Sequence, residues 1–157
     1  MQTQIITPRA YDPQKVRLFL FAQRVSGYAA DTKIQVSRNE DNAIPHVGVD
    51  GEVSVALSRN QSGVVTVSLQ NTSPWNGMLA NFQKAASVTG LIFFPVNLVG
   101  SQGMSLSTYG WIQRQPDLSY GTEVGQMDWE IGVVDAWLHP DELAGIFGLA
   151  GLTGLSF

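Results

Sequence analysis

The stretch of residues 50–90 constrains the fold of this chain most, because two alternating apolar runs are followed there by a helical pattern. Residues 52–57 and residues 64–69 each alternate between apolar and polar side chains, and turn-forming residues 59–63 separate them. The apolar positions are Val53, Val55 and Leu57 in the first run and Val65, Val67 and Leu69 in the second. Two period-2 runs around a short loop containing glycine are typical of a β-hairpin with one buried face. We therefore predict that residues 52–57 pair with residues 64–69.

An α-helix is predicted directly after the second run, over about residues 74–87. Ser73 belongs to the residue types that cap helices by accepting a bond from a free backbone N–H. Pro74 suits the first helical position, where its missing N–H is not needed, and Gly90 supplies a stop. One stripe with helical spacing contains Trp75, Met78, Leu79, Phe82 and Ala86. We expect the first four of these side chains to pack on a sheet.

Apolar runs elsewhere predict five further strands, at residues 16–22, 33–37, 91–99, 104–114 and 127–134. The first run is almost continuously apolar, which is typical of a strand covered on both faces. Pro95 lies inside its run, and proline cannot donate to a ladder, so that strand is expected at an edge or with a bulge. The predicted fold is mainly β: a β-sandwich or barrel flanked by one helix, with a long protruding loop.

The protruding loop is a polar segment that begins at residue 38 and ends near residue 50. Residues 38–48 contain Pro45 and both signs of charge, and they are interpreted as a long exposed loop or a loosely paired hairpin. Loops of this length in a compact domain are usually functional or disordered. Apart from Ile44, Val47 and Val49, the segment offers its own domain few apolar anchors, so little burial offsets the entropy of ordering it.

The length of 157 residues and a hydrophobic content of 44% predict one domain with one core. Residues 1–14 are interpreted as an extended N-terminal arm. Residues 143–157 are apolar and carry glycine at every third position, and they are interpreted as a flexible tail that becomes ordered against a neighbouring subunit. This run is shorter than the roughly 20 apolar residues that a membrane-spanning helix needs. Residues 139–142 are interpreted as a loop that leads into a helix.

No catalytic or metal-binding set is recognised in the sequence, so neither enzymatic activity nor a cofactor is expected. The two histidines, His46 and His139, lie far apart and lack the converging partners that a metal site needs. Asp128 and Glu130 alternate with apolar residues, which is more typical of a solvated sheet face than of a hydrolase acid pair. The net charge is −4 and the nine basic residues form no cluster, whereas a sequence-specific DNA-binding protein usually has a basic stripe. Apolar runs without a catalytic set indicate a self-assembling structural protein.

Four segments in a fixed order carry a resemblance to a known family: residues 37–41, 47–53, 62–69 and 71–79. They read as a polar loop, a G-x-D-G-E turn, a strand with a G-x-V-T-V core and a T-S-P-x-N helix start. In this order they resemble the tail tube proteins of contractile-tailed bacteriophages. The resemblance covers about residues 31–90, and residues 128–131 are also similar to the last strand of these proteins.

The resemblance implies a structural virion protein that assembles into hexameric rings, which stack into the inner tail tube through which the genome enters the host. Implied partners are further copies of the chain and the tail sheath, baseplate and terminator proteins, and duplex DNA passes through the lumen without specific binding. Assembly in the host cytoplasm and a final place in the virion tail are implied as well. Tubes of non-contractile tails, secretion systems and pyocins share this fold, and the sequence does not choose among them.

Two groups of residues follow from the resemblance. The loop at residues 38–51 is expected to reach the adjacent ring and to become ordered there, through Arg38, Glu40, Asp41, Ile44, Val47, Val49 and Asp50. Candidates for the lumen wall are acidic residues on the polar faces of the strands, namely Glu52, Asp128 and Glu130. A negative charge on each subunit, summed around a ring, repels phosphate and suits a conduit for DNA.

The competing interpretation is a monomeric β-sandwich that binds carbohydrate or another ligand. In that case Trp111, Trp129 and Trp137 would form a stacking patch, although aromatic residues at alternate strand positions more often belong to the core. Size separates the two interpretations, because a module stays near 17.0 kDa and a tube protein forms rings or polymers.

Overall fold

The structure is a computed structural model and describes residue 8 and residues 10–30, 33–101 and 103–140. The predicted tail at residues 143–157 lies outside the described residues, and so does most of the predicted arm. The elements, in chain order, are the 3-10 helix η1 (Pro13–Lys15), β1 (Arg17–Leu20), β2 (Gln23–Arg24), β3 (Ile34–Arg38), β4 (Ala43–Val47), β5 (Val53–Leu57), β6 (Gly63–Gln70), α1 (Pro74–Thr89), β7 (Phe94–Val99), β8 (Met104–Arg114), β9 (Gln126–Val133) and β10 (His139–Pro140).

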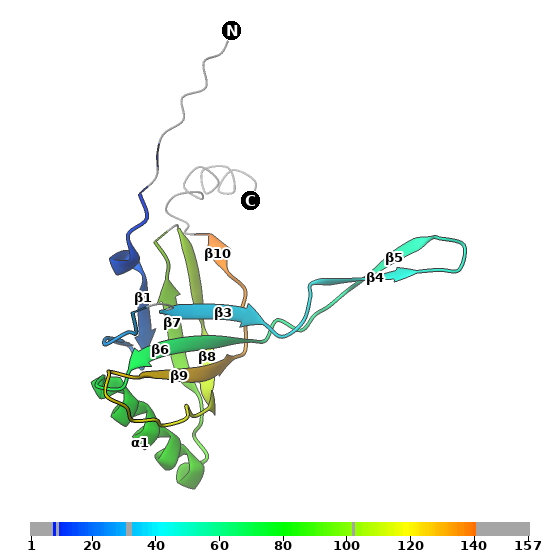
Figure 1. Ribbon diagram of the computed structural model, residues 1–157. Coiled ribbons are helices and arrows are strands. Elements are labelled where there is room, and N and C mark those ends of the chain that lie inside the picture. The colour runs from blue at the N-terminus through cyan, green and yellow to red at the C-terminus, as the bar shows by residue number, and fades with distance from the viewer. Residues whose placement is uncertain (1–7, 9, 31–32, 102, 141–157) are drawn as a thin grey trace, which may run out of the picture.

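Most strands belong to one antiparallel sheet with the order β2-β1-β7-β8-β9-β6-β3, and β10 pairs with β8. In Figure 1, β1 and β7 run steeply behind β3, β6 and β9, which run across the front, so the sheet folds over on itself into two layers. Its edge strands β2 and β3 are not joined in the described part of the chain, and no closed barrel is found. The prediction of a mainly β fold with one helix is confirmed.

The bend between the two layers lies at Gly110 in β8. This residue pairs with Phe94 on one side and with Val133 on the other, so the ladders to β7 and β9 meet there. A Cβ atom at this position would lie 2.8 Å from the carbonyl oxygen of Gly132 and 2.9 Å from a methyl group of Val96. Both distances are too short for a side chain, so glycine allows the layers to approach each other here.

The core fills the space between the two layers. Inward-facing side chains of both layers are fully buried, among them Leu18, Leu20, Val65, Val67, Leu69, Val96, Trp129, Ile131 and Val133. The predicted alternation of the second apolar run and of the closing strand is therefore confirmed. Because sheet stability depends on such side-chain packing, this interior is what holds the two layers together.

Helix α1 covers one open end of this core, and its capping residues are the ones that the sequence predicts. The Ser73 hydroxyl accepts a bond from the Trp75 N–H (3.4 Å) and donates one to the Ser26 carbonyl (2.8 Å). Gly90 adopts a left-handed conformation with φ of 77°, and its N–H donates to the Ala86 carbonyl (2.8 Å). The helix is two residues longer than predicted, because the left-handed residue at position 90 closes its last turn.

Three of the four predicted packing residues of α1 face the core. Trp75 and Leu79 are buried, and Phe82 contacts Phe21 and Phe94 with ring centroids 4.6 and 5.2 Å away. Met78 lies at the margin of the stripe and remains 42% exposed. The helix is thus anchored mainly by one side of its predicted stripe.

Leu79→Ala is expected to lower the free energy of unfolding by about 2–5 kcal/mol, because it leaves a cavity under the helix at a fully buried position. Met78→Ala is the matched control and should cost clearly less, since that side chain is partly in solvent. Chemical denaturation of both variants checks this. Equal stabilities of wild type and Leu79→Ala would mean that the stripe does not face the core.

The predicted hairpin between residues 52–57 and 64–69 is wrong in its pairing, although both strands exist. β5 pairs with β4, and β6 lies between β3 and β9. The residues between β5 and β6 do not form a tight turn, because they carry the chain from a projecting hairpin back to the body. The alternation of β5 consequently does not bury a face in the core of its own chain: Val53, Val55 and Leu57 are exposed.

Two smaller predictions are also corrected. β7 is an interior strand, not an edge strand, because it pairs with β1 on one side and with β8 on the other. It tolerates Pro95 because the β1 ladder ends at Leu20 opposite Val96, just before the proline. The Pro95 carbonyl instead accepts a bond from the N–H of Phe21 (3.4 Å), where the chain turns with positive φ. His139 and Pro140 form β10 and not the approach to a helix, while residues 141 and 142 lie outside the described residues.

Candidate assembly surfaces

The β4–β5 hairpin projects from the body of the molecule (Figure 1). It forms a two-stranded sheet of its own, with the register running from Ala43 opposite Leu57 to Val47 opposite Val53. The predicted protruding segment therefore exists as a paired hairpin and extends to residue 57. A two-stranded hairpin that packs on nothing is at best marginally stable in water. This element lacks, within one chain, the packing that would stabilise it.

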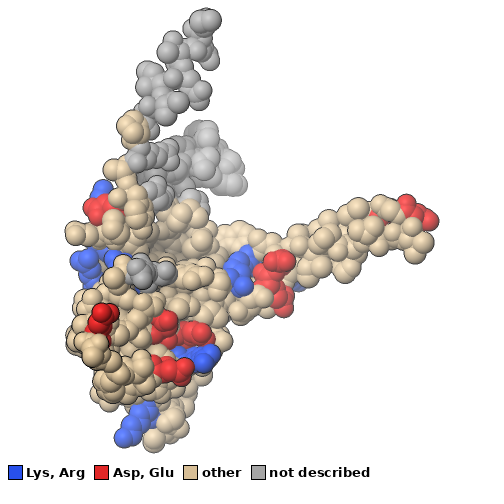
Figure 2. All heavy atoms as spheres, viewed as in Figure 1, with Lys and Arg blue, Asp and Glu red and all other residues tan. Residues whose placement is uncertain are grey.

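One face of the hairpin is entirely apolar. Residues directly opposite each other in an antiparallel pair share a face. The apolar hairpin face is therefore formed by Ala43, Pro45, Val47, Val53, Val55 and Leu57, while the opposite face carries Ile44, His46, Ser54 and Ala56. Leu57 is 80% exposed, and on the side shown in Figure 2 charged atoms lie only at the tip and the base of the hairpin. A contiguous apolar face of this kind indicates an interface.

Arg38 holds the base of the hairpin on the body. Its guanidinium donates to the Asn60 carbonyl (3.1 Å) and to the side-chain oxygen of Asn42, so it ties together the two chain segments that enter and leave the hairpin. The same guanidinium lies over the Trp137 ring, 5.3 Å from its centroid. Cation–π contacts of this type stabilise by about 0.5–1 kcal/mol at exposed sites. Arg38 thus anchors the hairpin at its base and does not belong to its projecting part.

A second set of polar contacts links the two segments beside Arg38. The Asn39 amide donates to the Ser62 hydroxyl (3.0 Å), and the Ser58 hydroxyl donates to the Glu40 carboxylate (2.8 Å). Side-chain hydrogen bonds from Asn60 and from Ser58 lower the pKa of Glu40. Because these bonds favour the ionised carboxylate, their contribution is present above the ordinary pKa and is lost as the pH falls through the lowered one.

The Glu40 carboxyl is expected to titrate below its ordinary value of 4.5 in an NMR titration of the folded chain. In Ser58→Ala its pKa should rise back toward that value, because one of the two donors is lost. Thr72→Ala changes an exposed hydroxyl outside this network and should leave the titration unchanged. Identical Glu40 titrations in wild type and Ser58→Ala would show that this contact does not hold the hairpin base.

The structure distributes the predicted inter-ring residues over different parts of the hairpin. Arg38, Glu40 and Asp41 lie at its base, Val47 lies on the apolar face and Ile44 lies on the opposite face. Val49 and Asp50 lie in the connection between the two strands, and both are exposed. Sequence reasoning missed the β5 half of the apolar face, formed by Val53, Val55 and Leu57. The alternation that marks them was recognised but was assigned to the wrong partner strand.

Two of the three predicted lumen residues share one surface. Asp128 and Glu130 lie on the outer face of β9, opposite Ser68 and Thr66 of β6. Glu52 immediately precedes β5 in the projecting hairpin, so the structure does not bring it to this face. The predicted acidic group is therefore divided between the outer face of β9 and the hairpin.

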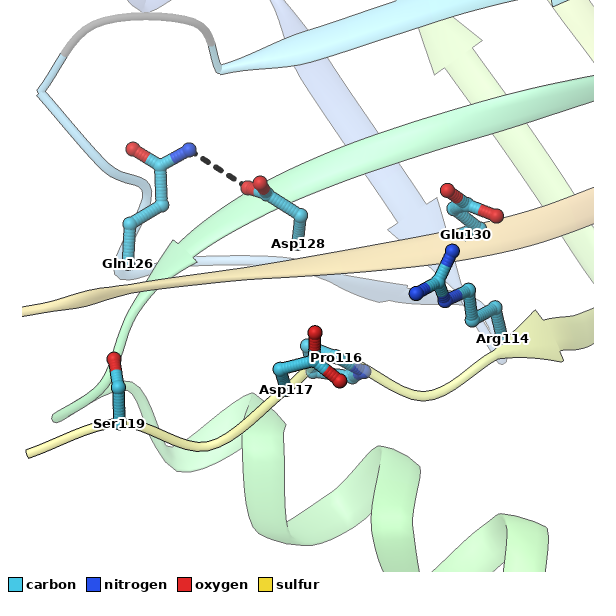
Figure 3. Close-up of a pocket in the computed structure, with 7 residues that line it drawn as sticks. All are labelled: Arg114, Pro116, Asp117, Ser119, Gln126, Asp128 and Glu130. Carbon is cyan, nitrogen blue, oxygen red and sulfur yellow. Dashed lines mark hydrogen bonds between the residues drawn. The ribbon is translucent and has the colours of Figure 1, made fainter.

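The outer face of β9 borders a shallow pocket of about 360 Å³ that is predominantly acidic. It is lined by Arg114, Pro116, Asp117, Ser119, Gln126, Asp128 and Glu130 (Figure 3). The Gln126 amide donates to Asp128 (2.7 Å), and the Arg114 guanidinium points toward Glu130. Among the residues that the structure describes, no group of three or more His, Cys, Asp or Glu side chains is placed to hold a metal ion. The arrangement presents a mainly anionic surface.

The three tryptophans of the competing interpretation do not share a surface. Trp129 is fully buried, and its indole N–H donates to the Asn76 side chain (2.9 Å). Trp111 lies against Gly132 on the outer face of the sheet, and Trp137 lies beside Arg38. A stacking platform that includes Trp129 is therefore wrong, because a ring enclosed by the core cannot contact a sugar.

The segment before β1 is attached to the body through Lys33. Its ammonium donates to the Pro13 and Val16 carbonyls (3.0 and 3.2 Å) and lies 4.4 Å from the centre of the Tyr28 ring. Burial lowers the pKa of Lys33 and raises the pKa of Tyr28 to about 12. The described part of the predicted arm is thus held at residues 13–16.

In the described part of the chain, no helix combines the length and apolarity needed to cross a membrane.

Comparison with known proteins gives one family and one fold. Residues 21–138 match the family model described as the bacteriophage PhiTE tail tube protein. Among solved structures, the chain is similar to the cap of the anti-feeding prophage, described as the AFP tube terminating cap, with a TM-score of 0.58 and 10% identity. That likeness covers 88% of this chain and 96% of the cap chain, and at this identity it concerns the fold alone. No curated protein sequence matches the chain.

Proposed function

Because the chain belongs to the bacteriophage PhiTE tail tube protein family, with a structural role in the phage tail, we propose that it forms stacked hexameric rings. These rings build the inner tail tube, the conduit through which the genome enters the host. The apolar hairpin face is the observation that carries this proposal, since a projecting element with an uncovered apolar face needs a partner. Residues 1–157 act in it as one tail-tube-like domain, with residues 1–14 and 143–157 available for further contacts between subunits.

The hairpin makes the contact between rings in this proposal. Arg38, Glu40 and Asp41 fix its base, and Ile44, Val47, Val49 and Asp50 belong to the part that reaches the neighbour. Polar contacts at the base set the direction in which the hairpin leaves the body. Apolar contacts along the apolar hairpin face supply affinity for the next ring. The hairpin is proposed to become ordered in this position on the next ring.

The outer face of the β3–β6–β9 layer is proposed as the wall of the lumen. It presents Gln35 and Thr66 beside Asp128 and Glu130, and Gln35 and Thr66 are register partners across β3 and β6. Such a face offers phosphate groups polar side chains and negative charge but no basic cluster. DNA is then repelled from the wall and passes without being held. Tail sheath, baseplate and terminator proteins are the proposed partners at the outer wall and the two ends of the tube.

Assembled tubes are expected to retain duplex DNA negligibly near physiological salt. Asp128→Lys should produce retention that weakens steeply as salt is raised, because a basic wall binds phosphate through counterion release. Asn81→Lys combined with Ala85→Lys is the control, since it adds the same two units of charge on the exposed side of α1. Co-sedimentation of DNA with tubes measures the effect. Micromolar retention by wild-type tubes, or equal retention by both variants, would contradict a lumen at this face.

Sedimentation velocity of the purified chain tests the proposed function. A tube protein sediments as rings or long polymers at working concentration, whereas a ligand-binding module stays near 17.0 kDa. A single monomeric species over the whole accessible concentration range would reject self-assembly. The monomeric alternative has lost its main support, because Trp129 lies in the core.

A further inference from the structure

We propose that the apolar hairpin face of one copy docks on the α1–β7 surface of a second copy. The α1–β7 surface consists of Val88, Leu91, Ile92 and Phe93, at the end of α1 and in the connection to β7. This inference rests on the proposed self-assembly and adds the identity of the receiving surface, which no sequence motif indicates.

The α1–β7 surface is apolar, contiguous and exposed. Val88 is 83% exposed and Leu91 is 76% exposed, although both are large aliphatic residues. The Phe93 and Trp111 rings form a T-shaped pair with centroids 6.0 Å apart, so the connection is packed onto the sheet. None of these residues is charged, and four exposed apolar side chains within six consecutive positions are unusual for a surface that faces water only.

A small pocket beside this surface provides a place for an aliphatic side chain. Its volume is about 180 Å³, and it is lined by Phe82, Gln83, Ala86, Ser87, Ile92 and Ile112. The lining is mainly apolar, and the Ile92 side chain is shared between the pocket and the α1–β7 surface. A projecting residue such as Leu57 on the apolar hairpin face fits such a pocket by size and polarity.

The occupant is a second copy for two reasons. The hairpin leaves the body on a different side from α1, so in Figure 1 it points away from the α1–β7 surface of its own chain. Both surfaces also lack charged side chains, so neither selects against the other by charge. Every copy offers one apolar hairpin face and one α1–β7 surface. A contact between two different patches on identical chains is heterologous and propagates from copy to copy, as a tube requires.

Cross-linking through introduced cysteines tests the contact against a clean background, because the chain contains no cysteine. The test variant combines Val55→Cys, on the apolar hairpin face, with Leu91→Cys, on the α1–β7 surface. Assembled material is treated with a short bismaleimide and separated under denaturing conditions. The expected result is a ladder of dimers, trimers and larger species, since each copy is joined to the next. Each single-cysteine variant should give only the monomer band under denaturing conditions.

Two control variants separate this contact from proximity in general. Ser54→Cys with Leu91→Cys moves the hairpin thiol to the opposite face, and Val55→Cys with Asn81→Cys moves the other thiol along α1, to an exposed position seven residues before Val88. Both should give at least tenfold less of the ladder. A ladder of equal strength from either control would overturn the docking pair.

The remaining outcomes distinguish this inference from the proposed function. Normal tubes of the test variant without any ladder would reject the docking pair and keep self-assembly. Absence of all polymers in the wild-type chain would reject self-assembly itself. An efficient cross-link within single chains between Leu91→Cys and Leu152→Cys would assign the α1–β7 surface to the chain's own residues 143–157 and would also overturn the inference.

Discussion

Replacing residues 42–58 with a short Gly/Ser linker is expected to abolish tube growth and leave a folded body. The β4–β5 hairpin forms its own sheet and contributes no side chain to the buried core. Its two ends lie close together, since the Ser58 N–H donates to the Asn42 carbonyl (2.9 Å), so a short linker can join them. Far-UV circular dichroism should remain near that of the wild type, while electron microscopy should show no tubes.

The excision must include both strands of the hairpin. A deletion guided by the sequence alone would remove residues 40–49 and leave β5 with three exposed apolar residues and no partner strand. A finer pair of variants tests the apolar face itself: Val55→Asp should block tube growth, and Ser54→Asp on the opposite face should reduce it far less. Tubes of normal length from the excised chain would place the stacking contact elsewhere, with the two termini as the next candidates.

Trp129→Ala is expected to lower the free energy of unfolding by about 3–5 kcal/mol, because it removes the largest fully buried side chain. The substitution also removes the indole N–H that donates to the Asn76 side-chain oxygen (2.9 Å), a hydrogen bond between β9 and α1. Trp129→Phe keeps most of the packing and loses the hydrogen bond, so it should cost only part of this energy. Chemical denaturation of the three proteins measures both contributions.

A small loss of stability in Trp129→Ala would mean that the indole does not fill the core. The ligand-binding interpretation would then regain support, because an indole that contributes little to packing is free to contact a ligand. We expect Trp129→Ala to lose much of its stability and still to assemble normally at low temperature. Trp129 lies in the core of the body, whereas the apolar hairpin face belongs to a separate sheet.

The sequence specifies those elements whose signals are local. Ser73, Pro74 and Gly90 determine the ends of α1 through capping and backbone preference, so its bounds were predicted to within two residues. The period-2 patterns likewise predicted β6 and β9, because their alternation is buried in the core of the same chain. Fold class followed from these elements together.

Strand pairing could not be predicted, because it depends on contacts between distant segments. The sequence pattern makes β5 and β6 look like the two strands of one hairpin. In the structure Asn60 and Ser62 instead form hydrogen bonds at the base of the β4–β5 hairpin and do not form a turn between β5 and β6. Alternation in β5 is equally strong whether its apolar side chains meet the same chain or another copy. For the same reason the candidate interface was only half recognised, through Val47 and not through Val53, Val55 and Leu57.

The backbone conformation after β1 explains why β7, which contains Pro95, lies in the interior of the sheet and not at its edge. Phe21 and Ala22 turn the chain with φ of 55° and 60° directly after β1, and neither residue type indicates this. That turn ends the β1 ladder before Pro95, so an interior strand tolerates the proline. The acidic outer face of β9 was anticipated from Asp128 and Glu130, whereas its neighbour Arg114 became evident only from the β8–β9 register.

Negative-stain electron microscopy of the purified chain tests most directly the central claim that identical copies of this chain build a tube. The expected images are side views of stacked rings and end-on views with six-fold symmetry around an open centre. Single particles the size of a 17.0 kDa monomer, at the same concentration and without rings or polymers, would contradict it.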